Sequence, residues 1–399
     1  MPAPEISFEN TEKAFNAKGS SELKRSLWLF KLMGNPGLVK VFSKLTLFAI
    51  KIGLPIKAPI KATIFKQFCG GESIEESKEV VAKLGRSHIG SILDYSVEGK
   101  EREEDFYKTK DEVLKIIKTA KDNPAIPYTS LKLTGISRFD LLEKMNLKQI
   151  LNAEEEKDYQ NVRGRLVEIC YYAAQSNVPI YFDAEESWIQ EAIDTLSEEM
   201  MELNNKKSAI VLTTLQMYRW DRIDYLKKLI QKARDKKFFI GIKLVRGAYI
   251  ERENIRAAEM GYKSPIQSTK ENTDRDFDKA VDICLENIDV VTLCAGTHNE
   301  ASTMHLIDKM KELKIANDDV RVYFSQLYGM SDHITYNLAD AGYNVTKYLP
   351  YGPVNSVIPY LIRRAEENTG IAGQMGRELK LIIEEKNRRH NSKLLPAGK

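Results

Sequence analysis

Short apolar runs alternate with longer amphipathic segments from residue 88 onward. The runs are rich in β-branched and aromatic residues, and segments such as 102–122 and 221–237 carry apolar residues at helical spacing. This alternation predicts buried parallel strands joined by crossover helices. The eight predicted strands lie at 89–96, 129–134, 178–186, 209–216, 239–245, 290–299, 320–327 and 344–350.

Eight strand–helix units are the number that closes a (β/α)8 barrel of the TIM type. An open doubly wound sheet is the alternative α/β arrangement, but the chain has no GxGxxG turn for a dinucleotide. We therefore predict a barrel over 86–375, with an N-terminal helical arm at 1–85 and a C-terminal helical tail at 376–399.

The arm is both basic and apolar. Lysines interleave with apolar residues over 37–65, which fits a packed arm with solvated lysines and also fits a membrane-surface or partner helix. The most apolar window, 45–56, is broken by Lys51, Gly53 and Pro55. It is shorter than the roughly 20 apolar residues of a spanning helix. With no signal peptide visible, we expect a cytoplasmic protein and leave a peripheral membrane contact open.

Composition narrows the class of partner. The 399 residues include 60 basic and 57 acidic ones, and a net charge of +3 does not indicate a nucleic acid. The four cysteines show no CxxC spacing, which argues against a disulfide framework or a zinc site. His298 has no second ligand at metal spacing, since His305 is seven residues on. We expect no metal.

In a barrel the active site forms where the strands end. Seven of the predicted ends carry polar side chains after apolar runs, and this repetition indicates a site. The residues at these ends are Lys132, Asp183, Ala184, Glu185, Glu186, Gln216, Lys243, Arg246, Gly247, Ala248, Tyr249, Thr297, His298, Asn299, Gln326, Leu327 and Tyr348.

A helix is predicted near the C-terminal end of the barrel, with Ser356 as its N-cap and Pro359 in its first turn. Helical spacing gives it two stripes on roughly opposite sides. The apolar stripe holds Ile358, Leu361, Ile362 and Ala365, and the polar stripe holds Tyr360, Arg363, Arg364 and Glu367. The polar stripe fits an exposed ion pair, and it equally fits a clamp for a carboxylate.

The segment 348–368, YLPYGPVNSVIPYLIRRAEEN, closely resembles the C-terminal signature of proline dehydrogenases, which are FAD-dependent enzymes of proline catabolism. Five further blocks resemble that family's other signatures in the family's order: LDYSVE, LKLT, DAEE, KLVRGAY and GTHN. The resemblance covers 88–370. It implies a distorted (β/α)8 barrel whose last helix lies over the mouth.

The resemblance also implies roles. Arg363, Arg364 and Lys132 would pair with the carboxylate of L-proline, and Tyr360, Leu327 and Tyr348 would wall its ring. Asp183 would orient the cations, and Lys243 would lie near the reactive flavin nitrogen. The implied FAD contacts are Asp183, Ala184, Gln216, Lys243, Arg246, Gly247, Ala248, Tyr249, Thr297, His298, Asn299 and Glu367.

The implied reaction is FAD-dependent oxidation of L-proline to Δ1-pyrroline-5-carboxylate, the first step from proline to glutamate. The implied acceptor is a membrane quinone, and pyrroline-5-carboxylate dehydrogenase would be a separate protein. The chain has Lys243 where some relatives have arginine, and relatives that oxidise hydroxyproline carry a small residue at the position of Tyr348. Two other functions are possible for such a barrel: a Schiff-base aldolase that uses Lys132 or Lys243, and an inactive barrel that serves as a scaffold.

Overall fold

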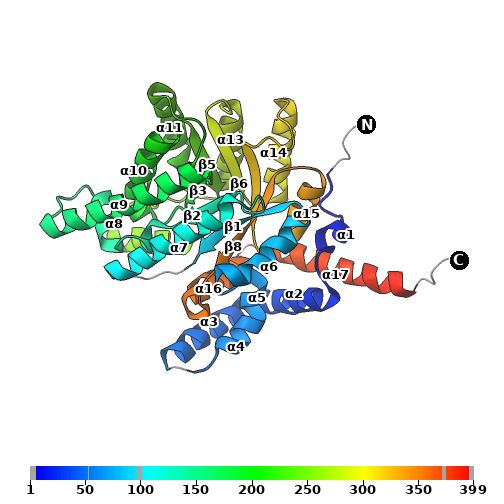
Figure 1. Ribbon diagram of the computed structural model, residues 1–399. Coiled ribbons are helices and arrows are strands. Elements are labelled where there is room, and N and C mark those ends of the chain that lie inside the picture. Colours follow the sequence, from blue (N-terminus) through cyan, green and yellow to red (C-terminus); the bar gives the residue numbers. More distant parts are fainter. Residues whose placement is uncertain (1–5, 53, 97–100, 371–373, 395–399) are drawn as a thin grey trace.

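Eight parallel strands close into a barrel in the order β1 to β8 (Figure 1). The computed structural model describes residues 6–52, 54–96, 101–370 and 374–394. The predicted (β/α)8 fold is therefore confirmed. The strands are β1 Ile89–Tyr95, β2 Tyr128–Leu131, β3 Ile180–Phe182, β4 Val211–Gln216, β5 Ile240–Val245, β6 Val291–Gly296, β7 Val322–Leu327 and β8 Val345–Tyr351.

Helices on the outside of the barrel join successive strands (Figure 1). All of them except α12 bury an apolar face against the strands, as amphipathic periodicity requires. They are α7 Glu103–Lys121, α8 Phe139–Asn146, α9 Ala153–Ser176, α10 Ser187–Asn204, α11 Arg222–Lys236, α12 Ile250–Met260, α13 Lys270–Glu286, α14 Glu300–Glu312 and α15 Asp332–Asp340; the short 3₁₀ turn η2 is Leu133–Gly135.

The barrel interior is filled rather than hollow. Because side chains alternate between the two faces of a strand, every second residue points inward. Inward residues of five strands form a buried cluster, in which the rings of Tyr128 and Tyr181 stack with centroids 4.8 Å apart. Tyr348 of β8 packs against it. This layer makes an aromatic floor beneath the strand ends.

The N-terminal helices pack on the two C-terminal helices and form a second core with them (Figure 1). Phe30 and Phe68 of the arm lie in one cluster with Val357 and Leu381. The elements are α1 Thr11–Phe15, α2 Ser20–Met33, α3 Pro36–Lys51, α4 Lys57–Ile60, the π-helical η1 Lys61–Phe65, α5 Lys66–Phe68, α6 Ile74–Gly85, α16 Val354–Gly370 and α17 Gln374–Leu394. None of the described helices is both long and apolar enough to cross a bilayer.

The start of α16 differs from the prediction. The helix begins at Val354, so Ser356 is not its N-cap, and Pro359 lies inside the helix rather than in a first turn that follows Ser356. The carbonyl of Pro353 accepts from the backbone N of Ser356 at 2.8 Å and of Val357 at 3.2 Å. Gly352, at φ 145°, turns the chain out of β8 directly into the helix. Backbone geometry therefore starts the helix before the first side chain that could cap it.

Candidate active site

Asp183 stands at the centre of the strand-end face, directly after β3. It is 7% exposed and forms an ion pair with Lys243 of β5. Its second oxygen accepts from the Tyr348 hydroxyl of β8 at 2.5 Å. Lys243 Nζ also lies 5.0 Å from the ring centroid of Tyr181 and 5.2 Å from that of Tyr348. One carboxylate thus fixes an ammonium and a phenol from two other strands over an aromatic floor.

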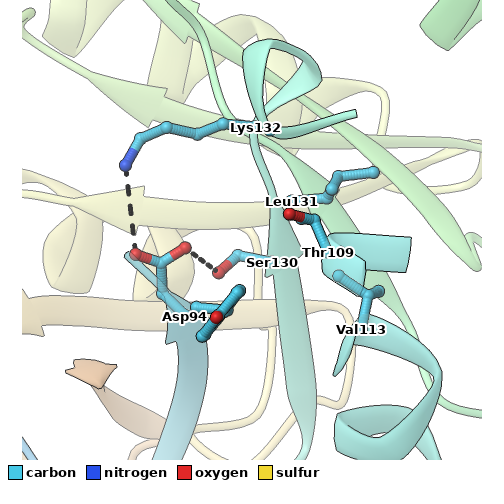
Figure 2. Close-up of a pocket in the computed structure, with 8 residues that line it drawn as sticks. Asp94, Thr109, Val113, Ser130, Leu131 and Lys132 are labelled. Atoms are coloured by element: carbon cyan, nitrogen blue, oxygen red, sulfur yellow. Dashed lines mark hydrogen bonds and ion pairs between the residues drawn. The ribbon is translucent and has the colours of Figure 1, made fainter. Parts of the chain in front are cut away.

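A second buried carboxylate, Asp94 of β1, lies beside Lys132, the residue that follows β2 (Figure 2). Lys132 Nζ is 3.9 Å from Asp94 Oδ2, and Ser130 Oγ donates to Asp94 Oδ1 at 3.2 Å. Ser130 Oγ is also 3.5 Å from the hydroxyl of Tyr348. A chain of polar contacts therefore runs across the mouth from Lys243 through Asp183 to Lys132.

The sequence prediction missed Asp94 and Ser130. Asp94 is 2% exposed and also accepts from the hydroxyl of Ser96. The available signal was an acid within the apolar run of β1, since a buried carboxylate needs a cation and hydrogen-bond donors. That signal marks Asp94 as special, but it does not identify Lys132 as the partner.

Helix α16 carries Arg363 and Arg364, the two arginines that were predicted to bind a carboxylate. Burial raises the pKa of Glu186, just after β3, and the positive charges of Arg252 and Arg363 counter part of that rise. Arg364 is 7% exposed, and its guanidinium lies 5.1 Å from the ring centroid of Tyr360. The side chain of Glu367 lies outside the part of the chain that the structure describes.

The DAEE segment also ties neighbouring strand ends together. Burial raises the pKa of Glu185 to about 7, and hydrogen bonds from Thr134 act in the opposite direction. The backbone N of Thr134, in the turn after β2, donates to Glu185 at 3.1 Å. Gln216 of β4 donates to the carbonyl of Glu185 at 2.7 Å and accepts from the backbone N of Ala248 at 3.4 Å. These hydrogen bonds thus connect the ends of β2, β3, β4 and β5. Ala184 lies between Asp183 and Glu185 in the chain.

The loop after β5 is shaped by Arg246 and Gly247. Arg246 donates to Thr297 Oγ1 at 2.7 Å and to Ser302 Oγ at 2.9 Å, and it pairs with Asp274 at 2.6 Å. Gly247 has φ 135°, and a Cβ there would lie 2.6 Å from the ring of Tyr218. Only glycine fits this turn. The next residues are Ala248 and Tyr249, and Tyr249 is the N-cap of α12.

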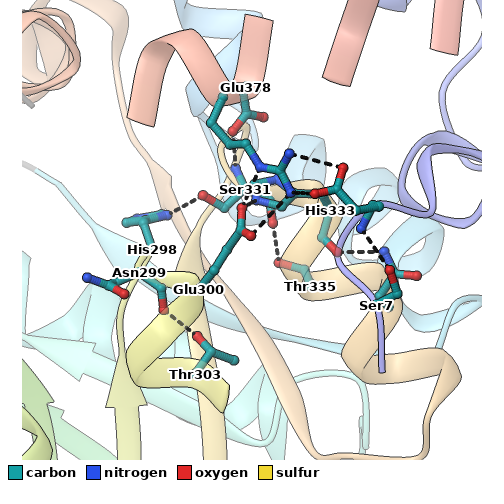
Figure 3. A network of polar contacts seen from close by, with 12 residues as sticks. Ser7, His298, Asn299, Glu300, Thr303, Ser331, His333, Thr335 and Glu378 are labelled. Atoms are coloured by element: carbon teal, nitrogen blue, oxygen red, sulfur yellow. Dashed lines mark hydrogen bonds and ion pairs between the residues drawn. The ribbon is translucent and has the colours of Figure 1, made fainter. Parts of the chain in front are cut away.

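His298 lies two residues beyond β6 and is partly buried (Figure 3). Burial lowers its pKa to about 3, and the positive charges of Lys347 and Arg364 contribute. Its Nδ1 lies 2.9 Å from the hydroxyl of Ser331, and its Nε2 accepts weakly from the backbone N of Leu327 at 3.5 Å. Asn299 caps α14 by accepting from the backbone N of Ser302 at 3.1 Å. The imidazole is thus positioned between the ends of β6 and β7.

The structure brings the predicted residues to one face but in separate groups. Asp183, Lys243 and Tyr348 contact each other, and Lys132 joins them through Asp94 and Ser130. A second group joins Arg246, Thr297 and Asn299. Among the described residues, no three His, Cys, Asp or Glu side chains gather as metal ligands.

This donor set fits a flavin nucleotide. Lys243 and Gln216 are donors beside an aromatic floor, which suits the polar edge and flat face of a flavin ring. Thr214, paired with Lys243 across β4 and β5, has a buried hydroxyl with no hydrogen-bond partner among the described residues. Arg246 is suited to a phosphate, since guanidinium binds phosphate oxygens in pairs.

Three comparisons place the chain among known proteins. The family model for proline dehydrogenase matches residues 77–377. The carbapenem antibiotics biosynthesis protein CarD of Pectobacterium carotovorum subsp. carotovorum is 34% identical and covers 81% of this chain and 83% of its own length. Proline dehydrogenase 2, mitochondrial, of Arabidopsis thaliana is 30% identical, with 98% and 92% covered.

The fold is also found in solved structures. Proline utilization A from Bdellovibrio bacteriovorus, inactivated by N-propargylglycine, aligns over 94% of this chain with a TM-score of 0.71 and 19% identity. This chain spans 40% of that longer protein. The family match over 77–377, together with relatives of at least 30% identity along most of their length, shows that the chain belongs to the proline dehydrogenase family of enzymes.

Proposed function

We propose that the protein oxidises L-proline to Δ1-pyrroline-5-carboxylate and that FAD, bound at the strand ends, accepts the hydride. The observation that carries this proposal is the cluster of Asp183, Lys243 and Tyr348 over an aromatic floor. Lys132, which follows β2, is connected to this cluster through Asp94 and Ser130, and α16 adds Arg363 and Arg364. Proline needs both parts: cations for its carboxylate and a flat apolar surface for its ring.

Lys132, Arg363 and Arg364 would bind the carboxylate of proline. Arg364 and the acids near Lys132 and Arg363 are largely buried, so charge-assisted hydrogen bonds to a substrate carboxylate would be shielded from water. Fixing the ring in one orientation supplies the proximity part of catalysis. The same positive charges disfavour a protonated amine, and the neutral amine has the lone pair that assists loss of hydride from the neighbouring carbon.

Tyr348, Tyr360 and Leu327 would wall the ring of the substrate. The hydroxyl of Tyr348 is held by Asp183, so its ring has a set orientation. Tyr360 is buried in the second core, and Leu327 packs against the same core. Helix α16 and the arm thereby exclude water from one side of the substrate.

FAD supplies the hydride acceptor when it is bound. Lys243, with its orienting partner Asp183, would lie at the flavin ring, as would Gln216 and Ala184. Arg246 and the glycine turn after it would hold phosphate. The further contacts proposed for the nucleotide are Ala248, Tyr249, Thr297, His298, Asn299 and Glu367.

The decisive test is the visible spectrum of the purified protein before and after anaerobic addition of L-proline. We expect a flavin band that L-proline bleaches, while pyrrolidine, which lacks the carboxylate, bleaches it far more slowly. A colourless protein that FAD does not reconstitute contradicts the cofactor, and a yellow protein that L-proline leaves unbleached contradicts the substrate. Borohydride trapping of a substrate on Lys132 or Lys243 would instead support an aldolase.

We also propose that proline is preferred over hydroxyproline. The phenol of Tyr348 lies among Asp183, Ser130 and the ring of the proposed substrate, and it leaves little room for a hydroxyl on that ring. Values of kcat/KM for the two substrates test this preference. Equal values contradict it, whereas a Tyr348→Ser variant should narrow the difference.

The finer physiological assignment completes the proposal. Electrons would pass from the flavin to a membrane quinone, and the product would go to a separate pyrroline-5-carboxylate dehydrogenase on the route to glutamate. A cytoplasmic protein with a peripheral membrane contact would serve that acceptor. Reoxidation of the proline-reduced protein by a quinone in vesicles, faster than by oxygen, tests the acceptor.

A further inference from the structure

Helix α3 presents a row of large apolar side chains to solvent. We call this row the α3 face; its members are Leu38, Val41, Phe42, Leu45 and Phe48, and Ile52 follows them. They are 40–59% exposed. Their spacing of three and four residues places them on one side of the helix. Contiguous exposed apolar surface on a soluble domain marks a binding site rather than ordinary surface composition.

The opposite side of α3 is firmly packed. Val39 is buried in the second core with Val357 and Leu361 of α16. The helix contacts α2 and α16 (Figure 1). The exposure of the α3 face therefore does not result from a helix that fails to dock. The helix is docked through one side and turns a second apolar side outward.

The segment that carries the α3 face has charged residues of one sign only. From residue 36 to residue 66 the sequence has six lysines and no aspartate or glutamate. Lys40 and Lys44, one helical turn apart, are exposed and make no ion pair with the described residues. By helical spacing they lie beside the apolar row rather than within it. Lys57 and Lys61 are different, because both pair with Glu72, at 2.9 and 2.7 Å.

We propose that the α3 face docks on a membrane surface that contains anionic lipid headgroups. An apolar row bordered by lysines is the arrangement of interfacial helices, which place apolar side chains below the headgroups and lysines among them. A second copy of this chain fits less well. A two-fold contact would set the face of one copy against that of the other, and the lysines of both copies would then share one apolar interface without any acid from this segment.

Docking through this face would bring the mouth of the barrel toward the lipid. Helix α3 contacts α16, and α16 carries both arginines of the proposed substrate clamp. An acceptor dissolved in the bilayer would then have a short route to the site. This consequence rests on the proposed function, whereas the docking itself does not.

Co-sedimentation with vesicles tests the docking, using the full-length protein. Wild type should bind vesicles of phosphatidylglycerol and phosphatidylcholine. Phe42→Gln/Leu45→Gln/Phe48→Gln should weaken binding roughly a hundredfold, because three apolar side chains no longer insert. Lys40→Gln/Lys44→Gln should weaken it roughly thirtyfold on these vesicles and much less on pure phosphatidylcholine.

A matched control removes exposed apolar side chains elsewhere. Ile150→Gln/Tyr171→Gln/Met260→Gln replaces residues that are 97%, 62% and 64% exposed and lie outside α3, and it should bind vesicles as wild type does. The proposal is overturned if wild type does not bind vesicles or if the triple α3 variant binds as wild type does. It is also overturned if wild type forms a dimer that this variant abolishes while vesicles capture neither.

Turnover separates the docking from the proposed function. With a soluble dye as acceptor, the triple α3 variant should oxidise proline at the wild-type rate, since none of its altered residues belongs to the site. With quinone in vesicles its rate should fall along with its binding. If wild type binds vesicles through the α3 face but never oxidises proline, the proposed function fails and the docking stands.

Discussion

Single residues at the mouth show how opposite charges are balanced inside the barrel. Asp183 and Asp94 are both buried, and each has a lysine partner and a hydroxyl partner. A buried carboxylate without such partners would cost several kcal/mol. Each pair therefore holds a lysine in place before any ligand binds, which is the preorganisation that an anion or flavin site requires.

The arginine pair gives the most direct prediction at this scale. Arg364→Met should raise KM for L-proline roughly 10- to 100-fold with flavin retained, because one charge-assisted hydrogen bond to the carboxylate is lost. Arg363→Met should act in the same direction. Steady-state kinetics with the flavin absorbance recorded on the same samples provide the measurement. Loss of flavin with an unchanged KM would show that these arginines do not bind the carboxylate.

Asp94 is predicted to act through Lys132. Asp94→Asn removes the charge 3.9 Å from Lys132 Nζ, and we expect KM for proline to rise roughly tenfold while flavin stays bound. Glu385→Gln is the matched control, since Glu385 is another buried acid and pairs with Arg389 at 2.6 Å within α17. The control should lower stability and leave KM unchanged. Equal effects of both variants on KM would assign Asp94 a structural role only.

At the scale of elements, side chains after the strands set the shape of the mouth. Glu185 links the end of β3 to the turn after β2, and Gln216 links β4 to the loop after β5. Helix α16 contains Pro359 and carries Arg363 and Arg364, the two arginines of the proposed substrate clamp. The site is thus a property of loops fixed to a rigid barrel.

The Glu185 link predicts an unusual pH dependence. Burial raises the pKa of Glu185 from its usual 4.5 to about 7, so the folded state binds more protons than the unfolded state between these pH values. Its contribution to the free energy of unfolding therefore falls as pH rises through this window, by up to about 3 kcal/mol. Glu185→Gln removes this dependence. Urea unfolding at pH 5 and pH 7.5 measures this effect. The free energy of unfolding of the variant, relative to that of wild type, should be higher at pH 7.5 than at pH 5.

The control for this prediction is Glu191→Gln, a substitution at an exposed glutamate in α10. Its stability should follow the pH dependence of wild type. If the free energy of unfolding of the Glu185 variant has the same pH dependence as that of wild type between pH 5 and pH 7.5, the carboxyl of Glu185 does not take up a proton on folding as proposed.

At the scale of the whole molecule, the arm and the barrel share one core. The second core joins arm helices to α16 and α17, and Lys18 of the arm pairs with Asp332 of α15 at 2.8 Å. Asp332 also pairs with the buried Lys347 of β8 at 2.9 Å. Removing residues 1–70 would therefore expose core, which is why point variants of α3 are the better probes of membrane contact.

A shared core predicts that the arm and the barrel unfold together. The chain has three tryptophans: Trp28 in α2, Trp188 in α10 and Trp220 after β4. Trp188→Phe/Trp220→Phe leaves a reporter in the arm, and Trp28→Phe leaves reporters in the barrel. Thermal unfolding followed by fluorescence should give the same midpoint for both variants. The midpoint of each variant in circular dichroism corrects for the change in stability that its own substitutions cause. Separate midpoints would show an arm that unfolds independently.

Local pattern was enough for the sequence to determine the barrel and to predict the face that would carry its site. Strand and helix periodicity depend on neighbouring residues, so the eight strands were predictable, and strand ends of a parallel barrel must share one face. The six signature segments, found in the family's order between residues 88 and 370, identified the family. For the same reason Asp183, Lys243 and Arg246 were predicted at the mouth before the structure placed them there.

Tertiary structure alone decided which charges meet. Asp94 lies on β1 and Lys132 follows β2, while Glu185 follows β3 and Gln216 ends β4, and these contacts exist only because the neighbouring strands pair. The same holds for the outward side of α3, whose apolar residues match those of a buried helix in sequence. Contacts between residues far apart depend on the register and packing of the whole fold, which no local pattern records.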